Sequence, residues 1–114
     1  MLRLTVAALV LTAALAGCDR LSPEAKDGAE LIAQHGCGSC HTIPGVRGAT
    51  GKVGPPLTQI GAQAIVGGML PNTEDNLIKW IRTPQSVVPG NAMPNTELSD
   101  HDARDIASYL HTLR

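Results

Sequence analysis

Apolar residues recur every three to four positions in two stretches of the chain, a spacing that predicts amphipathic helices. The first stretch runs from Pro23 to His35, with Pro23 suited to the first helical turn and Gly36 able to end the helix. The second follows Ser99, which forms a capping box with Asp102 three residues later. Its apolar stripe comprises Ala103, Ile106, Ala107, Leu110 and Leu113.

The middle of the chain carries weaker helical patterns separated by loops. A short helix is predicted after Asn72 or Thr73 and ends at Thr83-Pro84. The apolar side of that helix comprises Leu77, Trp80 and Ile81. Residues 57–70 form a further helical candidate, which two glycines interrupt.

Two stretches rich in glycine and proline predict loops. One covers residues 42–56, and the other includes Val88-Pro89-Gly90. No alternating strand pattern and no repeat occurs in the sequence. We therefore expect a small all-α fold of three to five helices.

The first residues have the pattern of a secretory signal. Arg3 precedes an apolar stretch from Leu4 to Ala16, which is 13 residues long. Because a membrane-spanning helix needs about 20 apolar residues, this stretch is too short for a permanent anchor of that kind. The segment at the end of this signal, Leu15-Ala16-Gly17-Cys18, resembles the lipobox of bacterial lipoproteins, which implies lipidation of Cys18 after cleavage.

This pattern divides the chain into a lipoprotein signal peptide (1–17), a short tether (18–22) and one folded domain (23–114). The alternative is an ordinary cleaved signal that leaves Cys18 as an odd free thiol. Several acyl chains on Cys18 would exceed the two-signal threshold for stable attachment to a bilayer. The sequence therefore predicts a peripheral protein that stays tethered to a membrane.

Composition points to a bound group inside this domain. Removal of the signal leaves 97 residues, which is marginal for a purely apolar core. The aromatic side chains are limited to Trp80 and Tyr109, with no phenylalanine. Eight lysines and arginines stand against ten acidic residues after the signal, so nothing suggests a nucleic-acid partner.

The stretch Cys37-Gly38-Ser39-Cys40-His41 is the attachment signature of c-type haem. Each thiol can add to one haem vinyl group as a thioether, and His41 is then held under the iron as its proximal ligand. The motif predicts one covalent haem c on Cys37 and Cys40, which would supply the missing aromatic bulk.

Two other kinds of site use a Cys-x-x-Cys unit, namely a thioredoxin-like redox pair and half of a zinc site. A thioredoxin motif would lie in an alternating strand and helix pattern, which this sequence lacks. A tetrahedral zinc site would need a second ligand pair at suitable spacing. The remaining cysteine and histidines, which show no such pairing, are Cys18, His35, His101 and His111.

Met93 is the predicted second ligand of the iron. It lies between Pro89 and Pro94, which restrict the backbone, while Gly90 permits a turn. A sulfur ligand favours electron transfer at raised potential over chemistry at an open site. The rival distal ligands are His35, His101 and His111.

These features together resemble a class I cytochrome c, and within it the cytochrome c domain of caa3-type oxidase subunit II. The likeness runs from about Pro23 to Leu113. The segments that carry it are residues 36–42, residues 54–57, residues 76–82, Pro89-Gly90 with Met93-Pro94, and Tyr109-Leu110. The resemblance implies a small cytochrome c fold, with the helices wrapped around one covalently attached haem.

The resemblance also implies roles for individual residues. His41 and Met93 would ligate the iron. The Pro55 carbonyl would accept the ring proton of His41, and Leu57 would pack on the haem ring. Trp80 would cover the haem and reach a propionate. The alternative is a buried aromatic residue whose polar edge contacts solvent.

The function expected on these grounds is electron transfer without transformation of a substrate. A membrane-tethered mono-haem carrier would take one electron from a quinol-oxidising complex or a dehydrogenase and donate it to a terminal oxidase. It would lie in the bacterial cell envelope, in the periplasm or on the outer face of the cytoplasmic membrane. The alternatives are a haem subunit of a periplasmic dehydrogenase complex, a small-ligand-binding haem protein, and an assembly subunit with a structural haem.

Overall fold

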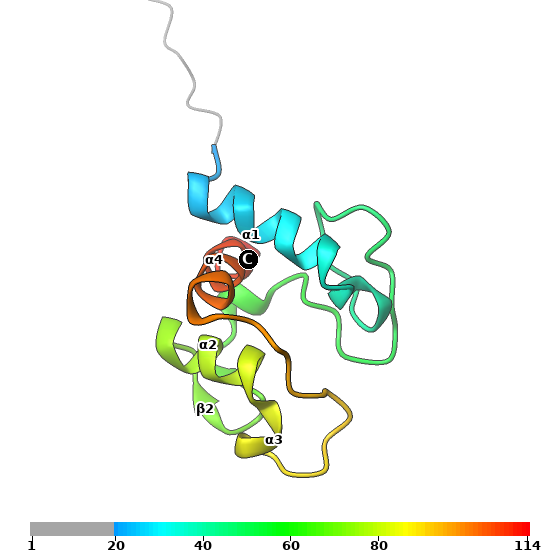
Figure 1. Ribbon diagram of the computed structural model, residues 1–114, viewed down its shortest axis with the longest axis vertical. Helices are drawn as coiled ribbons and strands as arrows, with labels where there is room; N and C mark the ends of the chain where they lie inside the picture. Colours follow the sequence, from blue (N-terminus) through cyan, green and yellow to red (C-terminus); the bar gives the residue numbers. More distant parts are fainter. Residues whose placement is uncertain (1–19) are drawn as a thin grey trace, which may run out of the picture.

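The computed structural model describes residues 20–114, which form four α-helices, two 3-10 turns and one small hairpin (Figure 1). The elements in chain order are α1 (Pro23–Gln34), η1 (Cys37–Ser39), η2 (Ile60–Ala62), β1 (Ile65–Val66), β2 (Leu70–Pro71), α2 (Glu74–Arg82), α3 (Pro84–Val87) and α4 (Asp100–Leu110). The expectation of three to five helices is confirmed. The predicted signal peptide and the lipidation site Cys18 lie outside the described residues.

The helices begin at hydroxyl side chains, as their sequences require. The hydroxyls of Ser22, Thr73 and Ser99 each accept a backbone N–H from the first turn of α1, α2 and α4, respectively. Gly36 follows α1 with a φ of 70°, the left-handed conformation that commonly ends a helix. The predicted start of α1 at Pro23 and the predicted cap of α4 at Ser99 are therefore confirmed.

The core lies where α1 crosses α4, with α2 packed on the other side of α4 (Figure 1). Ile32 of α1 and Ile106 of α4 are almost completely buried. The crossing is close because Gly28 faces α4 without a side chain, and a β-carbon there would overlap the carbonyl of Asp105. Helix contact at this point depends on a glycine in α1.

We expect the substitution Gly28→Ala to destabilise the folded protein by about 1–3 kcal/mol, because the added methyl group forces the two helices apart. Thermal unfolding followed by circular dichroism measures this loss. Ala33→Leu is the matched control, since it adds bulk to α1 at an exposed position. An unchanged unfolding temperature for Gly28→Ala would contradict the close crossing.

The prediction of a helix over residues 57–70 is wrong. Only the turn η2 is helical there, and residues 65–71 form an antiparallel hairpin in which Val66 pairs with Leu70. Gly67 and Gly68 have φ values of 59° and 69°, which an α-helix excludes and a tight turn requires. Each strand of this hairpin is only two residues long, so it leaves no alternating pattern in the sequence.

Residues after α2 form a short helix that the pattern does not predict, and the predicted loop at Val88-Pro89-Gly90 follows it. Pro84 ends α2, as expected, but it also starts the short helix α3. A proline has no N–H to donate, so it ends the preceding helix, and its φ suits the first position of the next helix. Pro84 therefore ends α2 and also begins α3.

Two side chains near the C-terminus form hydrogen bonds to the loop after η1 and to the residue that follows the hairpin. The hydroxyl of Tyr109 donates to the Pro44 carbonyl, and burial raises the pKa of this phenol, which keeps its proton in place. The Nε2 atom of His111 lies 2.9 Å from Oδ1 of Asn72, and burial lowers the pKa of the imidazole. Within residues 20–114, no helix combines the length and apolar character needed to span a bilayer.

Candidate functional site

The predicted attachment motif forms the turn η1 directly after α1. The backbone N–H groups of Cys40 and His41 both donate to the Cys37 carbonyl, at 3.2 and 3.1 Å. Both thiols are free, with Cys37 half-buried against the core and Cys40 exposed. Burial raises the pKa of the Cys37 thiol, an effect that a backbone hydrogen bond opposes and the neighbouring Cys40 reinforces. Two cysteines without a disulfide therefore lie on one turn.

The glycine-rich loop folds back onto this turn. The N–H of Gly51 donates to the Gly38 carbonyl at 2.9 Å, and that of Gly54 donates to the Cys40 carbonyl at 2.8 Å. A β-carbon on Gly38 would overlap Ala49, so the two segments are in contact. The loop thus fixes the backbone around the cysteines without regular secondary structure.

This loop also orients the ring of His41. The Nδ1 atom lies 2.7 Å from the Pro55 carbonyl oxygen, the contact that the resemblance implies. Gly54 lies against the ring, because a β-carbon on it would overlap Cε1 of His41. Since a carbonyl accepts only, Nδ1 carries the proton and Nε2 keeps its lone pair for a metal. A separate backbone hydrogen bond of 2.9 Å joins Leu57 to Thr42.

Met93 lies on a second loop, between α3 and α4, and its side chain is half-buried. Its backbone N–H donates to Oδ1 of Asn91 at 2.7 Å, and its carbonyl accepts from Nε2 of Gln85 at 2.7 Å. The loops that contain His41 and Met93 extend to the same side of α4 in Figure 1. Side-chain amides therefore hold the Met93 loop independently of the hydrogen bonds around His41.

Leu57 and Trp80 are both half-buried and pack against the core. The Trp80 ring lies on the hairpin turn, where a β-carbon on Gly67 would overlap it. Within residues 20–114 the indole N–H of Trp80 makes no hydrogen bond to protein, so it is free to donate to a bound group.

The rival histidines are placed differently from His41. His35 is exposed at the end of α1, and His111 is hydrogen-bonded to Asn72. His101 is exposed on α4, with its Nδ1 atom 3.5 Å from Asp102 and 3.6 Å from Asp105. Among the described residues, no group of three or more cysteine, histidine or acidic side chains is arranged to hold a metal ion. A zinc site built on Cys37 and Cys40 therefore finds no support in this part of the chain.

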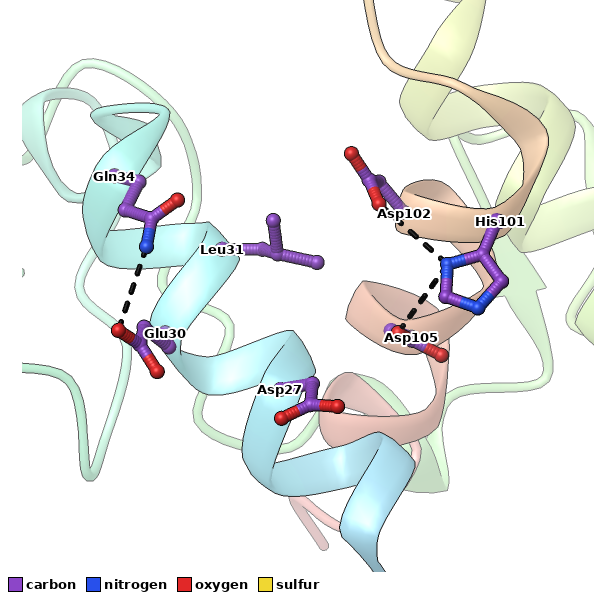
Figure 2. A pocket seen from close by; sticks show the side chains of 7 residues that line it. All are labelled: Asp27, Glu30, Leu31, Gln34, His101, Asp102 and Asp105. Atoms are coloured by element: carbon purple, nitrogen blue, oxygen red, sulfur yellow. Dashed lines mark hydrogen bonds and ion pairs between the residues drawn. The ribbon is translucent and has the colours of Figure 1, made fainter.

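A hollow of about 300 Å³ lies between α1 and α4 (Figure 2). The residues that line it are Asp27, Glu30, Leu31, Gln34, His101, Asp102 and Asp105. Figure 2 shows acidic side chains from both helices at its rim. Of the candidate haem residues its walls contain only His101, a rival distal ligand, and four carboxylates disfavour a large apolar group.

The residues around the motif fit a covalently attached haem. Two free thiols lie on one turn. In the adjacent His41, Nδ1 is hydrogen-bonded to the Pro55 carbonyl and Nε2 is available. The loop from Thr42 to Pro56 approaches the ring of His41 so closely that only glycine fits at position 54. Cys37 and Cys40 would hold the haem through thioether bonds, and His41 would offer its Nε2 atom to the iron.

Residues 25–114 match the sequence model of a protein family described as cytochrome c. The chain belongs to the cytochrome c family. Its described residues have the small, mostly helical cytochrome c fold, and it binds haem c covalently through Cys37 and Cys40. The predicted family, fold class and cofactor are confirmed.

The relatives include three proteins named cytochrome c oxidase subunit 2. That of Alkalihalophilus pseudofirmus is 34% identical over 91 residues, which are 79% of this chain and 26% of the relative. That of Bacillus sp. strain PS3 is 35% identical over 96 residues, 81% of this chain and 27% of the relative. The Bacillus subtilis protein is 32% identical over 94 residues, with coverage of 79% and 26%. The chain thus spans about a quarter of the length of the curated relatives it matches.

A solved structure has a similar fold. It is the c-type cytochrome SorU from Sinorhizobium meliloti, with a TM-score of 0.55 and 21% identity. The match covers 79% of this chain and 90% of that structure. Together with the family match, these similarities assign electron transfer to the chain in general terms and imply redox partners.

Sequence reasoning missed two residues near the site, Gln85 and Asn91. Both hold the backbone of Met93. An amide residue in a turn region is most often a surface residue or a local cap, so their spacing carries no signal.

Proposed function

We propose that this chain is a membrane-tethered one-electron carrier of a respiratory chain, which donates to a terminal oxidase. Its donor is a quinol-oxidising complex or a dehydrogenase, and the chain transforms no substrate itself. It acts in the bacterial cell envelope, on the outer face of the cytoplasmic membrane. His41 and Met93 would ligate the haem iron, and Trp80 and Leu57 would cover the haem.

The observation that carries this proposal is the pair of separate hydrogen-bond networks around His41 and Met93. The Pro55 carbonyl fixes the imidazole at 2.7 Å, and the amides of Gln85 and Asn91 fix both backbone groups of Met93. Bound haem c supplies one-electron exchange between its ferric and ferrous states. An iron ligated by both His41 and Met93 favours this exchange over binding of an external ligand.

The direction of electron flow is supported by the relatives. All three are named as subunits of cytochrome c oxidase, and the match covers most of this chain. In this proposal the chain has the same role as the matched segment of these subunits, and it delivers its electron to an oxidase.

The membrane tether is supported by the sequence before α1. A lipid on Cys18 would be followed by only a few residues before the N-cap Ser22, a reach of about 15–20 Å when extended. The domain would therefore stay near the bilayer, where membrane-bound partners are found at high local concentration.

Rapid mixing of membranes from the source organism tests the proposal. We expect the haem of this chain to be reduced by quinol and reoxidised by oxygen within one turnover of the oxidase. Membranes that contain the Cys18→Ser variant should lose this haem to the soluble fraction and respire more slowly, while the variant keeps the wild-type spectrum. A haem that stays reduced when oxygen is added would contradict the proposed acceptor.

A further inference from the structure

The loop that carries Met93 has no helix or strand to position it. Residues 88–99 lie between α3 and α4, and they include only turns, bends and irregular backbone. A methionine side chain has three rotatable bonds and adapts to its surroundings, so it does not fix its own sulfur atom. The position of the sulfur therefore depends on what holds the loop backbone.

One residue outside this loop makes most of that connection. The Nε2 atom of Gln85 donates to the carbonyls of Asn91 and Met93, at 2.8 and 2.7 Å. Its Oε1 atom accepts the N–H of Gly90 at 2.8 Å, and its own backbone N–H donates to Oδ1 of Asn95 at 3.1 Å. Gln85 thus binds the loop at four residues, on both sides of the methionine.

Asn91 completes the arrangement from within the loop. Its Oδ1 atom accepts the N–H of Met93, while its Nδ2 atom donates to the carbonyls of Val88 at 2.7 Å and Pro84 at 3.3 Å. Both backbone polar groups of Met93 are therefore satisfied by side-chain amides, and both amides are anchored to α3 or its end. Pairing of partly buried backbone groups in this way disfavours alternative loop conformations.

These contacts are separate from those on the other side of the site. The ring of His41 is held by Pro55 and Gly54, and no hydrogen bond among residues 20–114 joins Gln85 to that loop. A change at Gln85 is therefore expected to affect Met93 without disturbing His41.

We propose that Gln85 is a positioning residue, which keeps the iron closed by holding Met93 in its ligating conformation. This inference rests on the proposed function, because it takes Met93 as the second axial ligand. When the Gln85 amide is lost, the loop opens part of the time and exposes the iron to small molecules. The chain as a whole stays folded, because α1, α2 and α4 do not depend on this amide.

Carbon monoxide binding to the reduced holoprotein tests this inference. Gln85→Leu removes both donors and the side-chain acceptor, whereas Gln85→Glu keeps the shape and an acceptor for Gly90 but loses both donors. The apparent affinity for carbon monoxide rises in proportion to the fraction of open iron. We expect both variants to bind it with at least about tenfold higher apparent affinity than the wild type, as two lost hydrogen bonds would allow.

Gln34→Leu is the matched control, because it makes the same substitution at an exposed glutamine on α1. It should leave the affinity unchanged, and the sulfur-to-iron charge-transfer band of the oxidised protein should weaken only in the Gln85 variants. Circular dichroism on the same samples reports whether the helices remain.

Two results would overturn the role of Gln85. One is a wild-type affinity in both folded variants. The other is loss of the helices in both variants at the assay temperature, since Gln85 would then be needed for the fold as a whole. Met93→Ala separates this inference from the proposed function. If Met93→Ala opens the iron and the Gln85 variants do not, only the inference fails. If the wild type is already as open as Met93→Ala, the closed site itself is wrong.

Discussion

Cys37→Ala combined with Cys40→Ala is expected to give a chain that carries no covalent haem and has no stable fold at room temperature. The apolar core of the described domain is small and contains one buried aromatic residue, Tyr109. A small domain with few large buried side chains gains little stability from its apolar core alone, and a bound group commonly supplies the rest. Leu57, Trp80 and Met93, all only half-buried, would lose the group that they are proposed to cover.

Haem staining after denaturing electrophoresis measures attachment, and circular dichroism measures helix content. Ser39→Ala is the control, because it changes an exposed side chain between the two cysteines and leaves both thiols in place. It should retain both the haem and the helices. A double cysteine variant that melts within a few degrees of the wild type would show that haem is dispensable for the fold.

Met93→Ala is expected to convert a closed haem into one that binds carbon monoxide at about one molecule per chain when reduced. The variant keeps its helices, since the side chain lies on an irregular loop outside α1, α2 and α4. Its reduction potential should fall, because the sulfur ligand favours the ferrous state. Optical titration with carbon monoxide provides the measurement.

Met69→Ala is the control for this experiment, because Met69 is 64% exposed in the hairpin turn. It should behave as the wild type does. If Met93→Ala stays closed to carbon monoxide, another side chain ligates the iron, and the exposed His35 and His101 become the candidates to be replaced next.

The sequence was most informative where a single residue type decides the local structure. Ser99 predicted the start of α4, and Pro23 predicted the start of α1, because few side chains suit those positions. The attachment motif predicted the cofactor for the same reason. Two thiols and an imidazole at that spacing have few other uses.

Residues 57–70 show where pattern reasoning fails. The apolar residues there fit a weak helical period, but Gly67 and Gly68 adopt positive φ and make a hairpin turn. The sequence alone does not reveal which conformation a glycine takes, because glycine allows both. Pro84 ended α2 as predicted, but the pattern did not reveal that the same proline begins α3, since a proline that ends one helix can begin another.

The Met93 loop was only half predictable. Pro89 and Pro94 indicated a restricted loop, but the amides of Gln85 and Asn91 that hold it are ordinary polar residues in the sequence. Their importance comes from contacts across two to eight residues in an irregular loop, which no period describes.

An optical redox titration of the purified wild-type protein, first under nitrogen and then under carbon monoxide, tests the central claim most directly. A ligand that binds only the ferrous form would raise the midpoint potential by mass action. We predict a single one-electron wave with the same midpoint potential under both gases, as expected for one covalent haem closed by His41 and Met93. A midpoint potential that rises under carbon monoxide would show an open iron in the wild type and contradict the electron-carrier account.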